Sequence, residues 1–159
     1  MMRLYFLRHG LADRDEWSGP DFERPLTHRG KAQMVRTADT IAELGLSIDL
    51  IVTSPLARAY QTAEIVADRL VMLDRLIADP RLAPGFGPHH LAEMLQAHPG
   101  LSGLMLVGHE PDFSDTISTM IGGGHVVCKK GGLARVDVPD GGWLEGDLVW
   151  LIPPKALIL

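Results

Sequence analysis

Three short apolar runs in this chain each end in a compact polar tip, and this feature constrains the fold most strongly. The first run leads into Arg8-His9-Gly10, the second into Thr53-Ser54-Pro55, and the third into Gly108-His109-Glu110-Pro111. Apolar runs without alternation are typical of strands buried on both faces of a sheet. Parallel strands bring their carboxyl ends to one edge, where open α/β sheets bind ligands. We therefore expect the three tips to meet in one crevice.

Helical patterns lie between the apolar runs, so strands and helices alternate along the chain. Thr27 is placed to cap a helix that Gly45 ends, and Ser54-Pro55 is placed to open the next helix, with the serine as its cap. This alternation predicts one three-layer α/β/α domain over residues 1–159, with a mostly parallel central sheet. The expected strands are 4–7, 49–53, 104–107, 133–138 and 147–152, and the expected helices are 28–44, the one after Ser54-Pro55, 89–97 and 112–121.

Loops and turns are indicated by proline, glycine and acidic residues. Residues 11–27 hold five acidic residues and form a long expected loop, and 79–88 form another. A turn at Asp140-Gly141-Gly142 would join the last two strands.

Composition narrows the functional classes. A formal net charge of −5 argues against general binding of nucleic acid through a basic face. The apolar stretch before Arg8 is too short for a signal peptide or a membrane span. Cys128 is the only cysteine, so no internal disulfide is expected. We therefore expect a cytoplasmic protein that binds neither nucleic acid nor membrane.

The residues at the strand ends suit a phosphate-like anion. Arg8, and Arg58 on the helix after the second tip, offer planar forks of N–H donors that match phosphate oxygens. A neutral imidazole such as that of His9 or His109 is a nucleophile that can accept a phosphoryl group. For His9 to attack, one ring nitrogen must be held as a donor, as a backbone carbonyl would do, and Gly10 lets the backbone come close.

Plainer explanations exist for each residue taken alone. A histidine at a strand end is usually a structural group, and Arg8 could simply pair with an acid such as Glu110. The placement of two arginines and two histidines at three strand ends favours a shared function instead.

The three tips resemble the motifs of the histidine phosphatase superfamily, also called phosphoglycerate mutase-like. Arg8-His9-Gly10 after an N-terminal strand is the family signature, Ser54-Pro-Leu-Ala-Arg58-Ala-Tyr-Gln61-Thr62-Ala63 is similar to the second motif, and Gly108-His109-Glu110 to the third. The resemblance covers residues 3 to about 115 and is closest to the small SixA-type phosphohistidine phosphatases. Their short length and the stretch Arg24-Pro-Leu-Thr-His-Arg-Gly30 look similar.

This resemblance implies a phosphoglycerate mutase-like fold and a two-step phosphatase reaction. His9 would accept the phosphoryl group and water would then remove it, while Arg8, Arg58 and His109 would bind that group. Glu110 is a further candidate, either to contact the substrate or to orient His109. No metal or other cofactor is implied, because cationic side chains neutralise the phosphoryl charge. The implied partner is a phosphorylated substrate, such as a protein that carries phosphohistidine.

One position departs from the family pattern. Larger members carry an acid after the second motif that protonates the leaving oxygen, and Pro84 stands in its place here. Loss of a general acid costs roughly two to four decades on ordinary phosphate esters, whereas the imidazole of phosphohistidine leaves easily once protonated. The departure fits a phosphoramidate substrate, although an aryl phosphate fits as well. Another carboxyl could also supply the proton, and the candidates are Asp13, Asp15, Glu16, Asp79, Glu110 and Asp112.

Two other functions stay open. A small-molecule phosphomonoesterase would use the same four central residues, and a non-catalytic scaffold would keep the phosphate pocket without turnover. The presence of all four residues favours an enzyme. The chain has no large insertion between the second and third motifs to build a deep cap, which favours an open pocket and a protein-borne phosphohistidine.

Overall fold

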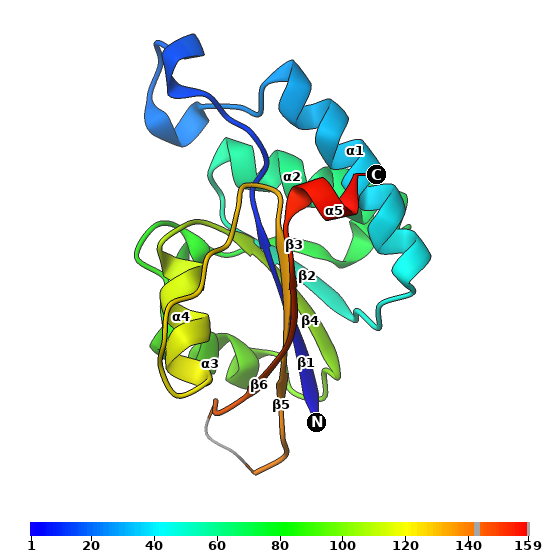
Figure 1. The fold of residues 1–159 in the computed structure, drawn as a ribbon, viewed down its shortest axis with the longest axis vertical. Helices are drawn as coiled ribbons and strands as arrows, with labels where there is room; N and C mark the ends of the chain where they lie inside the picture. Colours follow the sequence, from blue (N-terminus) through cyan, green and yellow to red (C-terminus); the bar gives the residue numbers. More distant parts are fainter. Residues whose placement is uncertain (142–143, 159) are drawn as a thin grey trace.

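A six-stranded sheet with helices on both faces forms the centre of the molecule (Figure 1). The computed structural model describes residues 1–141 and 144–158. The strands are β1 (Met2–Arg8), β2 (Leu50–Thr53), β3 (Leu76–Ala78), β4 (Gly103–Gly108), β5 (Leu133–Val138) and β6 (Asp147–Ile152). The α-helices are α1 (His28–Leu44), α2 (Ala57–Arg69), α3 (Pro88–Ala97), α4 (Asp112–Met120) and α5 (Pro154–Leu157).

The strand order is β3-β2-β4-β1-β5-β6. The first four strands in this order pair in parallel. The last two pair antiparallel, β5 with β1 and β6 with β5. The predicted α/β/α arrangement with a mostly parallel sheet is therefore confirmed. No helix within 1–141 or 144–158 is long and apolar enough to cross a membrane.

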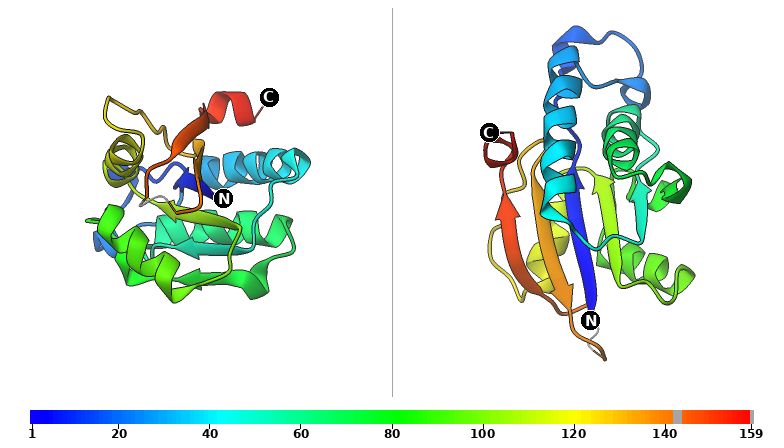
Figure 2. Two further views of the ribbon diagram at one scale, coloured as in Figure 1. Left: turned by 90° about the horizontal axis from the view of Figure 1, so that it is seen from below. Right: turned by 90° about the vertical axis from the view of Figure 1, so that its right-hand side faces the viewer.

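Helices cover both faces of the sheet (Figure 2). Alternating side chains of the central strands pack into two separate cores, one on each face. From β1, Leu4 and Phe6 pack with the layer of α3 and α4, where the Phe6 and Phe113 rings meet edge to face at 5.2 Å. Tyr5 and Leu7 pack with the layer of α1 and α2. Burial on both faces explains why the apolar run of β1 lacks a polar residue.

Most local expectations hold, and the exceptions have physical causes. Thr27 caps α1 by accepting a hydrogen bond from the Gly30 backbone N–H, as predicted. The prediction that Ser54 caps α2 is wrong, because the helix begins only at Ala57 and the Ser54 hydroxyl accepts from Leu56 N–H in a turn before it. The short β3 and α5 were not predicted, since three or four residues show no periodicity. The predicted turn after Asp140 includes Gly142, which lies outside the described residues.

Gly30 lies where α1 touches the backbone that follows β1. A Cβ on Gly30 would lie 2.3 Å from the carbonyl oxygen of Leu11, three residues beyond Arg8. The first turn of α1 can therefore approach the end of β1 only with glycine at this position.

Gly30→Ala is expected to destabilise the protein, although alanine normally improves a helix by about 1 kcal/mol. The backbone clash with Leu11 should cost about 1–3 kcal/mol. Urea unfolding measures the change, with Lys31→Ala at the next, exposed position as the control. A higher unfolding midpoint for Gly30→Ala would contradict the clash.

Candidate active site

The pairing of β1, β2 and β4 brings the three polar tips together at one edge of the sheet. Arg8 is paired with Gly108, and Thr53 with Val107, so all three strands end at the same level. A cleft of about 650 Å³ opens there. All five residues singled out from the sequence line it: Arg8, His9, Arg58, His109 and Glu110.

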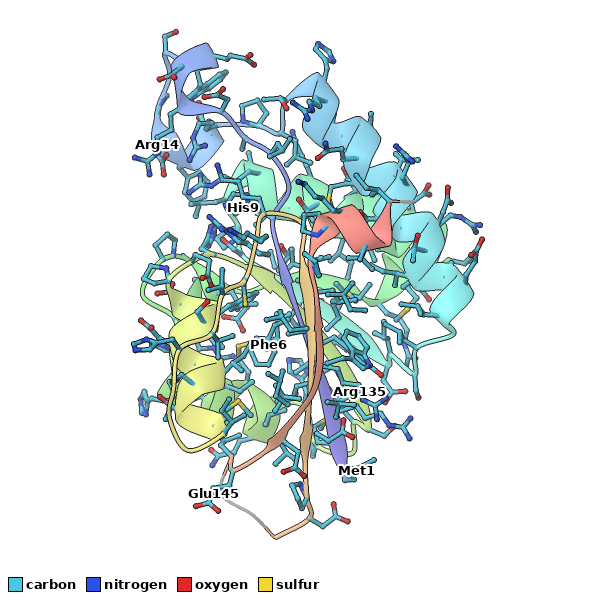
Figure 3. All side chains as sticks on the ribbon, in the orientation of Figure 1. Met1, Phe6, His9, Arg14, Arg135 and Glu145 are labelled. Atoms are coloured by element: carbon cyan, nitrogen blue, oxygen red, sulfur yellow. The ribbon has the colours of Figure 1, made fainter. Side chains whose placement is uncertain are left out.

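Figure 3 shows where this edge lies in the molecule. His9 lies at the upper end of β1 with Arg14 above it on the 11–27 loop, whereas Met1 and Glu145 lie at the opposite end. The 11–27 loop therefore forms one wall of the cleft, and it contributes Ala12, Asp13, Arg14, Asp15, Asp21 and Arg24.

His9 is held as a neutral ring with a defined tautomer. Its Nδ1 lies 2.7 Å from the carbonyl oxygen of Gly10, which can only accept, so Nδ1 carries the proton. Burial and, to a smaller extent, the nearby His109, Arg58 and Arg8 together lower the pKa of His9 to about 3, while the hydrogen bond to Gly10 opposes them. Nε2 is thus left with a free lone pair, which is the requirement for a nucleophile.

Gly10 is fixed in turn by helix α2. Its N–H donates to Thr62 Oγ1 over 3.1 Å, and the Thr62 hydroxyl donates to the carbonyl of Arg58 over 2.7 Å. A Cβ on Gly10 would lie 2.8 Å from Met34 Cγ, so a larger residue would push the loop away from α1.

His109 lies beside His9, with 5.3 Å between the ring centroids. Its Nε2 lies 2.7 Å from Ser54 Oγ, and its Nδ1 is buried with no hydrogen-bond partner among residues 1–141 and 144–158. Burial lowers the pKa of His109 to about 4, and the charge of Arg58 contributes. Both imidazoles are therefore neutral at physiological pH.

Arg58 is buried, Arg8 is half-buried, and both are only partly hydrogen-bonded. Arg8 donates from one terminal nitrogen to the Cys128 carbonyl over 2.9 Å. Arg58 donates to the Asp21 carbonyl over 3.0 Å and to its carboxylate over 3.3 Å. The Nε atoms of both arginines are buried without a partner in the described part of the chain. Burial lowers both pKa values below the ordinary arginine value, yet guanidinium groups stay charged in proteins.

Arg8 and Glu110 do not form the ion pair considered as the plainer explanation for Arg8. Instead, the Glu110 carboxylate accepts hydrogen bonds from the backbone N–H and the hydroxyl of Ser114. The Ser114 hydroxyl also accepts from the N–H of Cys128 over 3.3 Å. Glu110 thus supports the segment whose Cys128 carbonyl anchors Arg8.

The carboxyls considered as general acids fall into two groups. Asp79 binds Arg81 through both carboxylate oxygens, and Asp112 accepts a hydrogen bond from the Gly85 N–H. Neither carboxyl lines the cleft. Pro84 lines the cleft itself, in place of an acid. The candidates that line the cleft are Asp13, Asp15 and Glu110, and those that do not are Glu16, Asp79 and Asp112.

Asp21 is a site residue that sequence reasoning missed. Its carboxylate bridges Arg24 and Arg58, at 3.1 and 3.3 Å. Desolvation raises the pKa of Asp21, but the hydrogen bond from Arg24 and the charge of Arg58 outweigh it and hold that pKa below its usual value. Pairing across 37 residues leaves no local pattern, so nothing distinguished Asp21 from its acidic neighbours. Arg14 and Arg24 also line the cleft and were not predicted to, because the way the 11–27 loop folds over the strand ends leaves no local pattern.

The comparison with known families agrees with this geometry. A sequence profile described as "Histidine phosphatase superfamily (branch 1)" matches residues 4–101. This chain belongs to the histidine phosphatase superfamily. Membership confirms the family inferred from the three strand ends and supports phosphatase activity.

Individual relatives agree with this assignment. The chain is 30% identical to "Phosphohistidine phosphatase SixA" of Escherichia coli, over 69% of this chain and 68% of that protein. It is 38% identical to an uncharacterised protein of Picosynechococcus, with 99% of both chains covered. A structure of protein histidine phosphatase SixA complexed with tungstate superposes with a TM-score of 0.87, at 24% identity over 98% of this chain and 99% of that one. The phosphoglycerate mutase-like fold is therefore confirmed.

The histidine phosphatase site should show no imidazole titration near neutral pH. The pKa values of His9 and His109 are lowered to about 3 and 4, so protonation begins only as the pH falls below about 5. NMR signals of the two rings, assigned by their loss in His9→Ala and His109→Ala, should stay constant from pH 6 to 8. A midpoint between pH 6 and 7 for either ring would contradict the neutral pair.

Asp21 should weaken anion binding, because its carboxylate competes for Arg58 and repels an incoming dianion. Its side chain is 56% exposed, so the effect is screened. Asp21→Asn is expected to tighten inorganic phosphate binding on the order of two- to five-fold at low salt and less at high salt. Calorimetry measures this, with Asp68→Asn on the exposed face of α2 as the control. Weaker binding by Asp21→Asn would show that Asp21 instead holds Arg58 in place.

Proposed function

We propose that this protein is a metal-independent phosphohistidine phosphatase that passes the phosphoryl group through His9. The observation that carries the proposal is the state of His9. The ring is neutral, its Nδ1 proton is committed to the Gly10 carbonyl, and its Nε2 lone pair lies beside two guanidinium groups. A neutral nucleophile next to fixed cations suits attack on an anionic phosphoryl group.

The reaction would proceed in two displacements. In the first, His9 Nε2 forms a bond to phosphorus while the bond between phosphorus and the substrate nitrogen breaks, and the leaving imidazole takes a proton from solvent. In the second, water attacks phosphorus, the bond to His9 Nε2 breaks, and inorganic phosphate leaves. Arg8, Arg58 and His109 would hold the phosphoryl oxygens in both steps through donors that are unpartnered in the described structure.

A phosphoramidate substrate is supported by Pro84, which lines the cleft in place of a general acid and leaves Asp13 and Asp15 on the 11–27 loop as the lining carboxyls not paired with arginine or Ser114. The carboxylate of Asp21 is paired with two arginines, and that of Glu110 is engaged by Ser114. An ester would need a general acid to protonate its leaving alkoxide. Phosphohistidine does not, because its leaving imidazole is protonated from solvent.

A protein-borne substrate is supported by the openness of the cleft. Between the second and third motifs, only Pro84 contributes to the lining. The rest of the wall comes from the exposed 11–27 loop and from Lys130, so a large phosphorylated partner can reach His9.

A small-molecule phosphomonoesterase and a non-catalytic scaffold are the alternatives. A cytoplasmic location, with no binding to nucleic acid or membrane, stays a prediction.

The test compares wild type and His9→Ala on a phosphohistidine-bearing phosphotransfer protein and on p-nitrophenyl phosphate. Wild type should clear phosphohistidine much faster than the aryl ester, with or without chelator. His9→Ala should lose activity on the order of 10³-fold or more. An acid quench with radiolabelled substrate should trap a labelled enzyme only when His9 is present. His125→Ala, an exposed histidine outside the cleft, is the matched control.

Each other outcome assigns a different function. Turnover of small esters alone would contradict a protein substrate and would leave the role of His9 as nucleophile unchanged. Tight phosphate binding without any turnover would favour the scaffold. Loss of activity on adding chelator would contradict metal independence.

A further inference from the structure

Ser54 has no role in the proposed reaction, although it lies next to the phosphoryl-binding residues. It follows β2 and is completely buried. Its hydroxyl oxygen accepts a hydrogen bond from the Leu56 N–H over 3.2 Å and lies 2.7 Å from His109 Nε2. These two contacts are the only hydrogen bonds of that hydroxyl within the described residues.

The number of protons on these atoms decides the direction of the Ser54–His109 hydrogen bond. A serine hydroxyl has one hydrogen to donate, and Leu56 already occupies a lone pair of its oxygen. If His109 Nε2 donated to Ser54, the buried hydroxyl hydrogen and the Nδ1 lone pair of His109 would both lack a partner among residues 1–141 and 144–158. If the hydroxyl donates to Nε2 instead, only the Nδ1–H lacks a partner there, and the state with fewer unpaired buried groups is favoured. The hydroxyl therefore donates to Nε2, which must then be unprotonated.

We infer that Ser54 is a positioning residue that holds His109 in the Nδ1–H tautomer. A neutral imidazole carries one proton, so an acceptor at Nε2 places that proton on Nδ1. Nδ1 is the buried ring atom of His109 that lacks a partner in the described structure. The tautomer itself is independent of the proposed function. That this N–H binds a phosphoryl oxygen rests on the proposed function.

The two histidines thus share a tautomer and differ in which nitrogen is free. His9 uses its Nδ1–H on the Gly10 carbonyl and keeps the Nε2 lone pair. His109 uses its Nε2 lone pair on the Ser54 hydroxyl and keeps the Nδ1–H. The Gly10 carbonyl therefore leaves His9 as a nucleophile, and the Ser54 hydroxyl leaves His109 as a hydrogen-bond donor.

Long-range proton–nitrogen NMR correlations test the tautomer directly, because they distinguish Nδ1–H from Nε2–H in neutral rings. Wild type at pH 7 is expected to show Nδ1–H for both His9 and His109. In Ser54→Ala, His109 alone should gain the Nε2–H form. Thr116→Val is the matched control, because it removes a buried hydroxyl that makes no hydrogen bond within the described residues. An Nε2–H tautomer for His109 in wild type would overturn the inference, with no variant required.

Binding of tungstate, a phosphate-like oxyanion, tests the consequence without any turnover. Ser54→Ala should bind tungstate about ten- to a hundred-fold more weakly, as expected for losing a hydrogen bond to a charged ligand. Ser54→Thr keeps the hydroxyl and should restore both affinity and tautomer, whereas Thr116→Val should bind as wild type does. Unchanged affinity in a folded Ser54→Ala would overturn the donor role of His109. If these results hold while phosphohistidine is not cleaved, the proposed function fails and the role of Ser54 stands.

Discussion

The parallel pairing of β1 with β4 is the constraint on which the site depends. The ladder continues past the last strand residues, because the His9 N–H donates to the Gly108 carbonyl over 3.1 Å. Each strand is followed at once by a histidine, so the register that pairs Arg8 with Gly108 also places the rings of His9 and His109 side by side. Both strands are buried on both faces, so a slip of one residue would move the side chains of one strand into the opposite core, where they would not fit their new neighbours. The geometry of the two histidines is therefore fixed by the same packing that stabilises the sheet.

Burial and charge together decide what those rings can do. A histidine buried beside two guanidinium groups resists protonation, so the site keeps its cations on Arg8 and Arg58 and its imidazoles neutral. Attack by His9 requires a neutral imidazole, since a protonated ring has no free lone pair. The partners of the two rings then separate their roles. Gly10 offers only an acceptor and Ser54 offers a hydrogen, and neither contact requires a charged residue.

The predictable parts of this site are those set by neighbours in the chain. The strand ends follow from apolar runs, the cap of α1 from Thr27, and the state of His9 from the adjacent Gly10 carbonyl. The contacts that were not foreseen join distant residues, such as Arg58 to Asp21 across 37 positions and Arg8 to Cys128 across 120. Such contacts depend on how loops pack against the finished sheet, and a single sequence carries no periodic signal for them. The same limit explains why β3 and α5 were missed, since tertiary packing rather than local pattern stabilises such short elements.

The anchoring of Arg8 shows how a segment outside the three motifs contributes to the site. The loop before β5 presents the Cys128 carbonyl to the Arg8 guanidinium and the Cys128 N–H to Ser114 on α4. Ser114 in turn donates to Glu110, which directly follows His109. The third motif therefore reaches Arg8 through a serine and a peptide unit rather than by a direct ion pair. Glu110 binds neutral donors and forms no direct ion pair with Arg8, although its charge raises the pKa of Arg8 and offsets part of the effect of burial. That arrangement leaves Arg8 fixed in position with its positive charge available to an incoming phosphoryl group.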